Sequence, residues 1–305
     1  MKVLMISGDR NILKERSNAR MRFELQKSHV EQLDVFVWPQ RHSWRDITEA
    51  AQENHYDVIT AQDPFWRGLL AWMLARRTRA KLNIQVHTDL QAQPFIRHIL
   101  AQIVLRHADS VRVVSRKIQQ QVEKIGVSTP IHVLPIFVDL ERFRTLVRRP
   151  HERKTILWLG RFEAEKSPQT AIAVFRQVRG KGTDAELIML GAGSLEQELQ
   201  QQAQGLPVTF PGWQDPTTYL EVADVVLSTS TDEGYGASIV EALAAGIPVV
   251  APDVGIAREA GAVVVEREEF GAAIVRVFHS GERGLLKLSL PNAEEWAKQW
   301  RATLV

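Results

Sequence analysis

The stretch Glu233-Gly-Tyr-Gly-Ala-Ser-Ile-Val-Glu241 follows an apolar run, Asp224-Val-Val-Leu-Ser-Thr229, that is typical of a buried strand. Its two glycines let the backbone turn tightly after that strand, and a helix is predicted to begin near Gly236. The first amides of a helix are unpaired donors at the positive end of its dipole, where a phosphate group binds favourably. Because carboxylates repel phosphate, Glu233 and Glu241 are expected to face uncharged, hydroxyl-bearing parts of the same ligand.

A second loop of the same kind supplies cations. Gly160-Arg-Phe-Glu-Ala-Glu-Lys166 follows the apolar run 155–159 and precedes a helix that Ser167, as N-cap, and Pro168 announce. The carboxyl ends of parallel strands meet at one edge of a sheet, so Arg161 and Lys166 are expected to lie near the first loop. A guanidinium and an ammonium group at that edge form a clamp for a diphosphate, and a sugar nucleotide carries both the diphosphate and the hydroxyl groups.

Each loop also has a simpler explanation. Acidic residues near a helix start complement the helix dipole without any ligand, and a single arginine or lysine on a loop is commonly a solvated surface cation. The clamp is favoured because both cations occur on a loop that matches the acidic one in its position after a strand.

Together these residues resemble the retaining glycosyltransferases of family 4, which have the GT-B fold. Further motifs carry the resemblance: Leu190-Gly-Ala-Gly193, Phe210-Pro-Gly212, Ala223-Asp224 and Ala245-Gly-Ile-Pro-Val-Val-Ala251. The resemblance is dense over residues 155–265 and thin in the first half of the chain. It implies an α/β protein of two Rossmann-like domains that face each other across a cleft, with a last helix that crosses back to the first domain.

The resemblance and the loop chemistry together predict the roles of individual residues. Glu233 is expected to hold the sugar hydroxyls and Glu241 the ribose hydroxyls, while Gln214 lies by the base. His87 follows the apolar run 82–86, and family members carry a histidine there that contacts the transferred sugar. The residues predicted to bind the donor diphosphate are Arg161, Lys166, Gly236, Ala237, Ser238 and Gly8.

Two features of the first half remain open at this point. Family members have paired glycines in the first loop, whereas Ser7-Gly-Asp-Arg-Asn-Ile12 offers only Gly8, so the acceptor side is expected to be rebuilt. Asp89, shortly after His87, either joins the site or caps the following turn. A lone histidine at a strand end is also often a hydrogen-bonded structural residue.

Strand-like apolar runs alternate with helical stretches along the whole chain, as expected for parallel sheets covered by helices. The predicted strands begin near residues 2, 33, 57, 82, 111, 131, 155, 186, 224, 248 and 262. The basic stretch Arg142 to Lys154 interrupts the alternation and is the predicted linker. We therefore expect an acceptor-side domain over 1–147 and a nucleotide-sugar domain over 148–305, whose final helix, 292–304, packs on the first domain.

Composition is that of an ordinary globular protein, with 305 residues of which 45% are hydrophobic and 24% charged. The chain has no cysteine, which excludes disulfides and thiolate chemistry. No Asp-x-Asp and no spacing typical of metal ligands occurs, so neither a metal nor another cofactor is expected. No apolar run is long enough to span a membrane, and a cytoplasmic location is expected.

Charge is distributed unevenly. Residues 1–150 contain 24 Lys and Arg against 15 Asp and Glu, whereas residues 151–305 contain 14 against 21. A basic cluster, Arg76, Arg77, Arg79 and Lys81, ends a predicted helix. Cations there complement a helix dipole, but they also suit an anionic glycan, a lipid-linked acceptor or an acidic membrane surface. Nucleic acid is not expected, because no recognition motif accompanies the charge.

The function predicted is transfer of a sugar from a nucleoside-diphosphate sugar to a glycan or lipid-linked acceptor, with retention of configuration and without a metal. The alternative is a non-catalytic sugar-nucleotide-binding protein of the same fold. A hydrolase is less favoured because Glu233 and Glu241 share one helix start rather than flanking a bond. A nicotinamide oxidoreductase is less favoured because Gly191-Ala-Gly193 continues to Glu196 where a glycine is needed.

Overall fold

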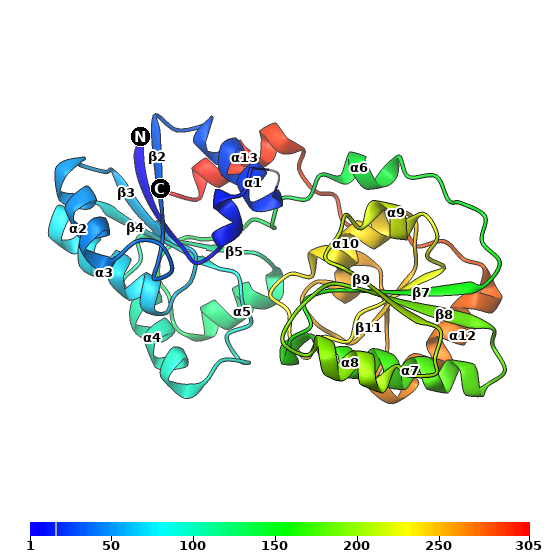
Figure 1. The fold of residues 1–305 in the computed structure, drawn as a ribbon. Coiled ribbons are helices and arrows are strands. Elements are labelled where there is room, and N and C mark those ends of the chain that lie inside the picture. Colours follow the sequence, from blue (N-terminus) through cyan, green and yellow to red (C-terminus); the bar gives the residue numbers. More distant parts are fainter. Residues whose placement is uncertain (16) are drawn as a thin grey trace. The chain divides into compact units, whose positions relative to one another are not determined.

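The computed structural model describes residues 1–15 and 17–305 and contains two compact units. Unit 1 comprises residues 1–137 and 290–305, and unit 2 comprises residues 138–289. Each unit is built on a sheet of six strands, and all strand pairs are parallel (Figure 1). Two parallel sheets with helices on their faces make up the predicted α/β fold of two Rossmann-like domains.

Unit 1 has the strand order β2-β1-β3-β4-β5-β6. Its strands are β1 (Lys2–Ser7), β2 (Gln32–Val37), β3 (Val58–Ala61), β4 (Lys81–Val86), β5 (Ser110–Val113) and β6 (Ile131–Val133). Its helices are η1 (Arg10–Leu13), α1 (Asn18–Lys27), α2 (Trp44–Glu53), α3 (Trp66–Thr78), α4 (Phe95–Arg106), α5 (Arg116–Lys124) and α13 (Ala293–Ala302). The inner strands β1 and β3 read as nearly continuous apolar runs because parallel strands are buried on both faces, whereas β4 and β5 also carry the buried polar residues Asn83, Gln85, Ser110 and Arg112.

The last helix, α13, belongs to the core of unit 1. It begins at Asn292, whose side chain accepts a hydrogen bond from the amide of Glu295 in a capping box. Trp296 and Trp300, four residues apart, are buried in one cluster with residues of β1 and α1. Helix α13 lies beside α1 (Figure 1). The Nδ2 atom of Asn83 also donates to the carbonyl oxygen of Thr303 over 2.8 Å. The chain therefore returns from unit 2 to complete the first core.

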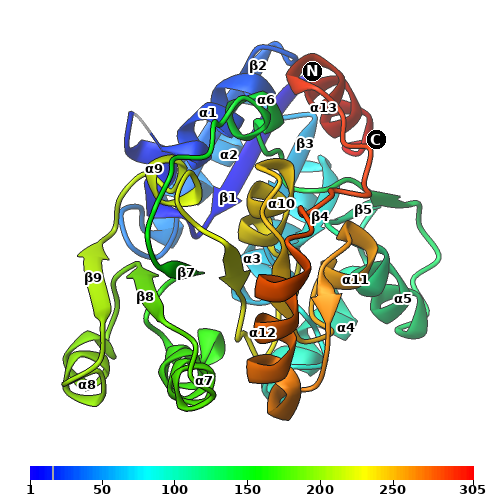
Figure 2. The ribbon, with the colours of Figure 1, turned by 90° about the vertical axis from the view of Figure 1, so that its right-hand side faces the viewer.

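Unit 2 has the strand order β12-β11-β10-β7-β8-β9. Its strands are β7 (Lys154–Leu159), β8 (Ala185–Leu190), β9 (Val208–Gly212), β10 (Val225–Leu227), β11 (Val249–Ala251) and β12 (Val263–Val264). Its helices are α6 (Leu140–Arg144), η2 (Ala164–Lys166), α7 (Pro168–Gly180), α8 (Glu196–Gln202), α9 (Thr217–Leu220), α10 (Ala237–Ala244), α11 (Ala257–Ala260), η3 (Arg267–Glu269) and α12 (Phe270–Ser280). Helices α7, α8 and α12 lie along one side of this sheet in both views (Figure 2).

Strand β9 was not among the predicted strands. It is an edge strand that pairs only with β8, its register shifts between Ile188 and Leu190, and it contains Pro211. Proline is tolerated at an edge because no neighbour needs its missing amide hydrogen. One-sided pairing and a Pro-Gly end weaken the apolar pattern from which a strand is predicted.

Ser167 is the N-cap residue of helix α7, as predicted, but its side chain does not cap the helix. Ser167 occupies the residue before the helix, but its backbone is left-handed, with φ of 47°, and its side chain makes no capping hydrogen bond. Its Oγ atom lies 2.8 Å from Oγ1 of Thr170 instead. Pro168 opens the helix as predicted.

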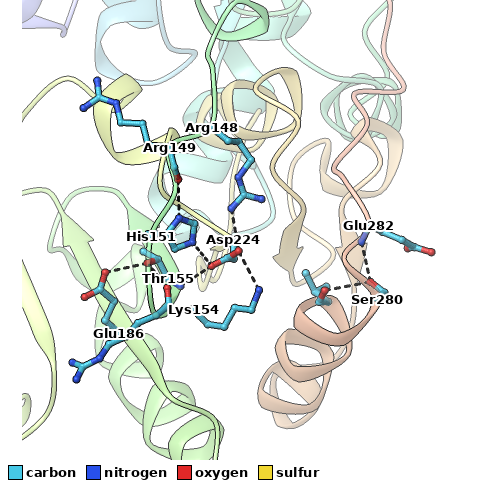
Figure 3. A network of polar contacts seen from close by, with 11 residues as sticks. Arg148, Arg149, His151, Lys154, Thr155, Glu186, Asp224, Ser280 and Glu282 are labelled. Atoms are coloured by element: carbon cyan, nitrogen blue, oxygen red, sulfur yellow. Dashed lines mark hydrogen bonds and ion pairs between the residues drawn. The ribbon is translucent and has the colours of Figure 1, made fainter.

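The predicted linker, Arg142 to Lys154, is fastened to unit 2 through Asp224. Arg148 donates to Oδ1 of Asp224 over 3.0 Å, and Nε2 of His151 lies 2.8 Å from Oδ2 (Figure 3). Oδ2 also accepts a hydrogen bond from the amide of Thr155, at the start of β7. Burial raises the pKa of Asp224, but these hydrogen bonds outweigh it and hold the pKa below its ordinary value. The carboxylate of Asp224 therefore holds the segment next to the start of β7, in the sheet of unit 2.

We expect Trp300→Ala to lower the free energy of unfolding of unit 1 by about 3–5 kcal/mol, because a fully buried indole leaves a cavity. Nε1 of Trp300 has no hydrogen-bond partner in the described part of the chain, so the loss reports packing. Urea unfolding monitored by circular dichroism measures it. The control is Trp213→Ala, at a side chain that is 70% exposed. Equal effects of the two substitutions would contradict the place of α13 in this core.

Candidate functional site

Two loops of unit 2 are joined to each other at the ends of β7 and β10. Nε1 of Trp158, in β7, donates to Oγ1 of Thr229, which in turn donates to the carbonyl oxygen of Lys166, each over 2.8 Å. The amide of Thr231 donates to the carbonyl oxygen of Glu165 over 2.9 Å. The loop after β10 therefore contacts the turn η2. The loop after β7, with η2, and the loop between β10 and α10 are together called the platform.

The platform brings Lys166 and Glu233 together, as their matching positions predict. Nζ of Lys166 forms an ion pair with Oε1 of Glu233, and both side chains are largely buried. Oγ of Ser230 donates to the same carboxylate oxygen over 2.8 Å. These contacts fix the carboxylate before any ligand arrives. An ammonium group carries three N–H donors, and this ion pair uses one.

Arg161 lies on the same platform with a different partner. Its Nη2 atom donates to Oε1 of Glu165 over 2.7 Å, and its side chain is 62% exposed. An exposed ion pair four residues apart is weak, so a bound anion can displace Glu165 at small cost. The two predicted clamp cations therefore lie on one loop, where Lys166 is largely buried and Arg161 is exposed.

Glycines keep the platform compact at two places. Gly236 precedes α10 with φ of 98°, a conformation that places the first amides of the helix directly after the turn. Gly255 packs under the same turn, where an added Cβ atom would come within 2.2 Å of the carbonyl oxygen of Tyr235. Ala237 and Ser238, predicted to contact the diphosphate, are the first two residues of α10.

Glu241 and Gln214 occupy the positions that the motifs predict. Glu241 lies in α10, and burial, then its charge, raise the pKa of the neighbouring phenol Tyr235. Gln214, in the loop after β9, donates to the carbonyl oxygen of Pro211 and accepts a hydrogen bond from Tyr219, each over 2.9 Å.

In unit 1, His87 directly follows β4. His87 is partly exposed, but its Nε2 atom is buried and has no hydrogen-bond partner in residues 1–15 and 17–305. Burial, and then the charges of Arg112 and Arg22, lower the pKa of His87 to about 3. The imidazole is therefore neutral at physiological pH.

Asp89 and Gly8 are engaged in local structure. Oδ1 of Asp89 accepts hydrogen bonds from the amide of Gln91 and from Nε2 of Gln121, so the carboxylate caps its own turn. Gly8 lies against Arg67: a Cβ atom added there would fall 2.4 Å from Cζ of the guanidinium. A side chain at this position would therefore require the guanidinium group of Arg67 to move.

Sequence reasoning missed two arginines. Arg267, on η3, donates to the carbonyl oxygens of Thr229 and Ser230, each over 3.0 Å, and so stabilises the platform. Arg267 stands in an acidic stretch typical of a protein surface, so the sequence did not indicate that it contacts the site. Arg112 lies in β5 and is buried near His87. An arginine inside an otherwise apolar strand was a signal that could have found it.

In the described residues, no three His, Asp or Glu side chains are grouped so that they could hold a metal ion. A search of the same residues finds no helix with the length and apolarity needed to cross a membrane.

Two family models match this chain. The model described as glycosyl transferases group 1 matches residues 153–280, and the model described as glycosyltransferase family 4 matches residues 23–142. The first match contains the whole platform, and the second contains His87.

Curated relatives agree with these matches. The chain is 26% identical over 234 residues to an alpha-monoglucosyldiacylglycerol synthase of Streptococcus pneumoniae, covering 67% of this chain and 53% of the relative. It is 28% identical over 179 residues to a GDP-mannose-dependent alpha-(1-6)-phosphatidylinositol dimannoside mannosyltransferase of Mycobacterium tuberculosis, covering 53% of this chain and 47% of the relative. The chain thus spans about half the length of the curated relatives it matches.

Solved structures share the fold over the whole chain. HepE of Anabaena in complex with UDP-glucose superposes with a TM-score of 0.77 at 18% identity, covering 100% of this chain and 95% of that one. A sucrose-phosphate synthase of Thermosynechococcus elongatus gives a TM-score of 0.74 at 17% identity, with the same coverage. With its two parallel six-stranded sheets, its platform motifs and these matches, the chain belongs to the family 4 glycosyltransferases and has the GT-B fold.

Proposed function

We propose that this protein transfers a sugar from a nucleoside-diphosphate sugar to a glycan or lipid-linked acceptor, with retention of anomeric configuration and without a metal ion. The observation that carries the proposal is the Lys166–Glu233 ion pair at the start of α10. It places a cation suited to phosphate and a carboxylate suited to sugar hydroxyls side by side on one rigid platform.

The leaving group determines what the platform has to do. When the glycosidic bond of the donor breaks, negative charge develops on the diphosphate, and catalysis requires groups that stabilise this charge more than the ground state. Lys166, Arg161 and the first amides of α10 are such groups. Because they are protein cations and dipoles, the proposal needs no divalent ion.

The carboxylates orient the donor in this proposal. Glu233, held by Lys166 and Ser230, accepts hydrogen bonds from the transferred sugar, and Glu241 accepts those from the ribose. Gln214 lies by the base. His87, neutral at physiological pH, serves as a hydrogen-bonding partner of the transferred sugar rather than as a cation.

One feature of the first loop supports the alternative function of a sugar-nucleotide-binding protein that is not an enzyme. Arg67 covers Gly8, so the first loop differs from one in which paired glycines approach the phosphates. A protein that binds the sugar nucleotide without transferring the sugar is consistent with this loop. Donor binding without turnover across a panel of acceptors would support that alternative.

We further propose that unit 1 attaches to anionic membranes at the cytoplasmic face, through α3 and α4. Neither helix contains an Asp or Glu. Apolar side chains that are exposed on them include Phe95, at 77%, and the basic cluster Arg76, Arg77, Arg79 and Lys81 is exposed at the end of α3. The names of both curated relatives specify lipid products or acceptors, which supports a lipid-linked acceptor here.

Arg161→Ala and Lys166→Ala should each weaken binding of a nucleoside diphosphate by roughly one to two orders of magnitude. Each substitution removes a charge-assisted contact worth about 1.5–3 kcal/mol, and about 1.4 kcal/mol corresponds to tenfold. Isothermal titration calorimetry with UDP, GDP and ADP measures the effect. Lys181→Ala, at an exposed cation of the same unit, is the matched control. Unchanged affinity in both platform variants would refute the clamp.

Turnover should continue in excess chelator, and the product should keep the anomeric configuration of the donor. The reason is that protein cations take the place of a metal and that the family resemblance implies retention. Proton NMR of the product formed with and without EDTA checks both expectations. Loss of turnover that magnesium restores would disprove the metal-free part, and an inverted product would disprove retention.

Changing Arg76, Arg77, Arg79 and Lys81 together to Gln should reduce attachment to anionic vesicles by roughly two to three orders of magnitude. Each cation near an anionic surface contributes about 1 kcal/mol, and the attraction is screened over about 8 Å at physiological ionic strength. Co-sedimentation with vesicles that contain or lack phosphatidylserine measures the effect. A variant with the exposed cations Lys27, Lys181, Arg276 and Arg301 changed to Gln controls for net charge. If the two variants sediment equally with the vesicles, the basic cluster is not the membrane-binding surface.

A further inference from the structure

Arg267 lies on η3, outside the platform, but its side chain contacts both loops of the platform. Its Nη2 atom donates to the carbonyl oxygens of Thr229 and Ser230, each over 3.0 Å, in the loop after β10. Its Nη1 atom makes a longer contact of 3.4 Å with Oγ of Ser167, in the loop after β7. One guanidinium group therefore connects the two loops that carry the candidate site.

The two residues of the β10 loop that Arg267 holds are each bonded to a residue of the site. Oγ1 of Thr229 donates to the carbonyl oxygen of Lys166, and Oγ of Ser230 donates to Oε1 of Glu233, each over 2.8 Å. Thr229 is 1% exposed and Ser230 is 4% exposed, so solvent does not compete for these contacts. The hydroxyl groups that position Lys166 and Glu233 thus extend from a backbone that Arg267 holds.

An arginine is well suited to this task. Its guanidinium presents N–H donors in a rigid planar fork, so that hydrogen bonds to several oxygens fix directions as well as distances. The hydrogen bonds of Arg267 run to carbonyl and hydroxyl oxygens, which are neutral. They therefore fix the course of the loop rather than pair one charge with another.

The two site residues depend on this support to different degrees. The amide of Lys166 also donates to the carbonyl oxygen of Glu163 within its own turn, over 3.0 Å. The flexible stem of a lysine further lets its ammonium group follow a bound phosphate. Glu233, in contrast, lies in the β10 loop itself, and its carboxylate is held by Ser230 and Lys166. A shift of that loop therefore displaces Glu233 more than Lys166.

From these contacts we propose that Arg267 is a positioning residue for Glu233. It sets how much more tightly the platform binds a nucleoside-diphosphate sugar than the nucleoside diphosphate alone. The inference rests on the proposed function, in which Glu233 binds the transferred sugar and Lys166 the diphosphate. A binding group has to be held within about 0.5 Å of its productive position, so a small shift of the loop is sufficient to lose the sugar contact.

The test is calorimetry of the full chain with UDP and UDP-glucose, GDP and GDP-mannose, and ADP and ADP-glucose, using for the variants the pair that the wild type binds best. Arg267→Ala should weaken the sugar nucleotide about tenfold and the nucleoside diphosphate less than about threefold, because the sugar contact is lost and the diphosphate contacts remain. Ser230→Ala, which removes the hydroxyl bonded to Glu233, should have the same effect. Arg276→Ala, at an exposed cation of α12, is the matched control and should bind as the wild type does.

A double-mutant cycle separates positioning from a general effect on the fold. When Glu233→Ala is already present, adding Arg267→Ala should change the affinity for the sugar nucleotide less than about twofold, because the carboxylate that Arg267 positions is absent. The proposal is overturned if the full loss persists in the Glu233→Ala background, or if Arg267→Ala weakens both ligands equally.

Hydrogen exchange of the free protein tests the same residue without any ligand. The amide of Thr231 donates to the carbonyl oxygen of Glu165 over 2.9 Å and should exchange about tenfold faster in Arg267→Ala, but not in Arg276→Ala. Unchanged exchange at Thr231 would also overturn the proposal. If the wild type binds none of the six nucleotides, the donor proposal fails, and exchange at Thr231 then decides whether Arg267 positions the loop.

Discussion

The hydrogen bonds that join the β10 loop to the turn after β7 are the constraint on which the candidate site depends. Thr229 lies between the indole of Trp158 and the carbonyl oxygen of Lys166, so a core residue of β7 sets the position of a lysine of the candidate site. Arg267 binds the same loop from η3. A carboxylate and an ammonium group can be held close together without a ligand only because their backbones are fixed first.

A second constraint is the return of the chain to unit 1. Helix α13 places Trp296 and Trp300 in the core of a sheet formed by the first half of the sequence. Nε1 of Trp296 donates to the carbonyl oxygen of Pro135, the same oxygen that accepts from Arg112. The last helix thus packs in the core, and it helps to hold a buried cation in place.

The charges of cationic side chains have different partners in the two units. On the platform of unit 2, cations are paired with carboxylates that a ligand can displace or share, as Arg161 is with Glu165. In unit 1, the guanidinium of Arg112 donates to neutral oxygens of Leu134, Gln85 and Pro135, and burial keeps His87 neutral.

The sequence by itself determined the alternation of strands and helices and the position of Arg161, Lys166 and Glu233 on loops after strands. These features follow from local periodicity, from turn residues and from the parallel sheet that places strand ends on one edge. Only the tertiary structure decided that Lys166 pairs with Glu233, that Asp89 caps its own turn, and that Arg67 covers Gly8. It also decided that Arg112 lies near His87. Side-chain partners far apart in sequence depend on packing between elements, and no local pattern encodes which of two neighbouring charges a lysine will meet.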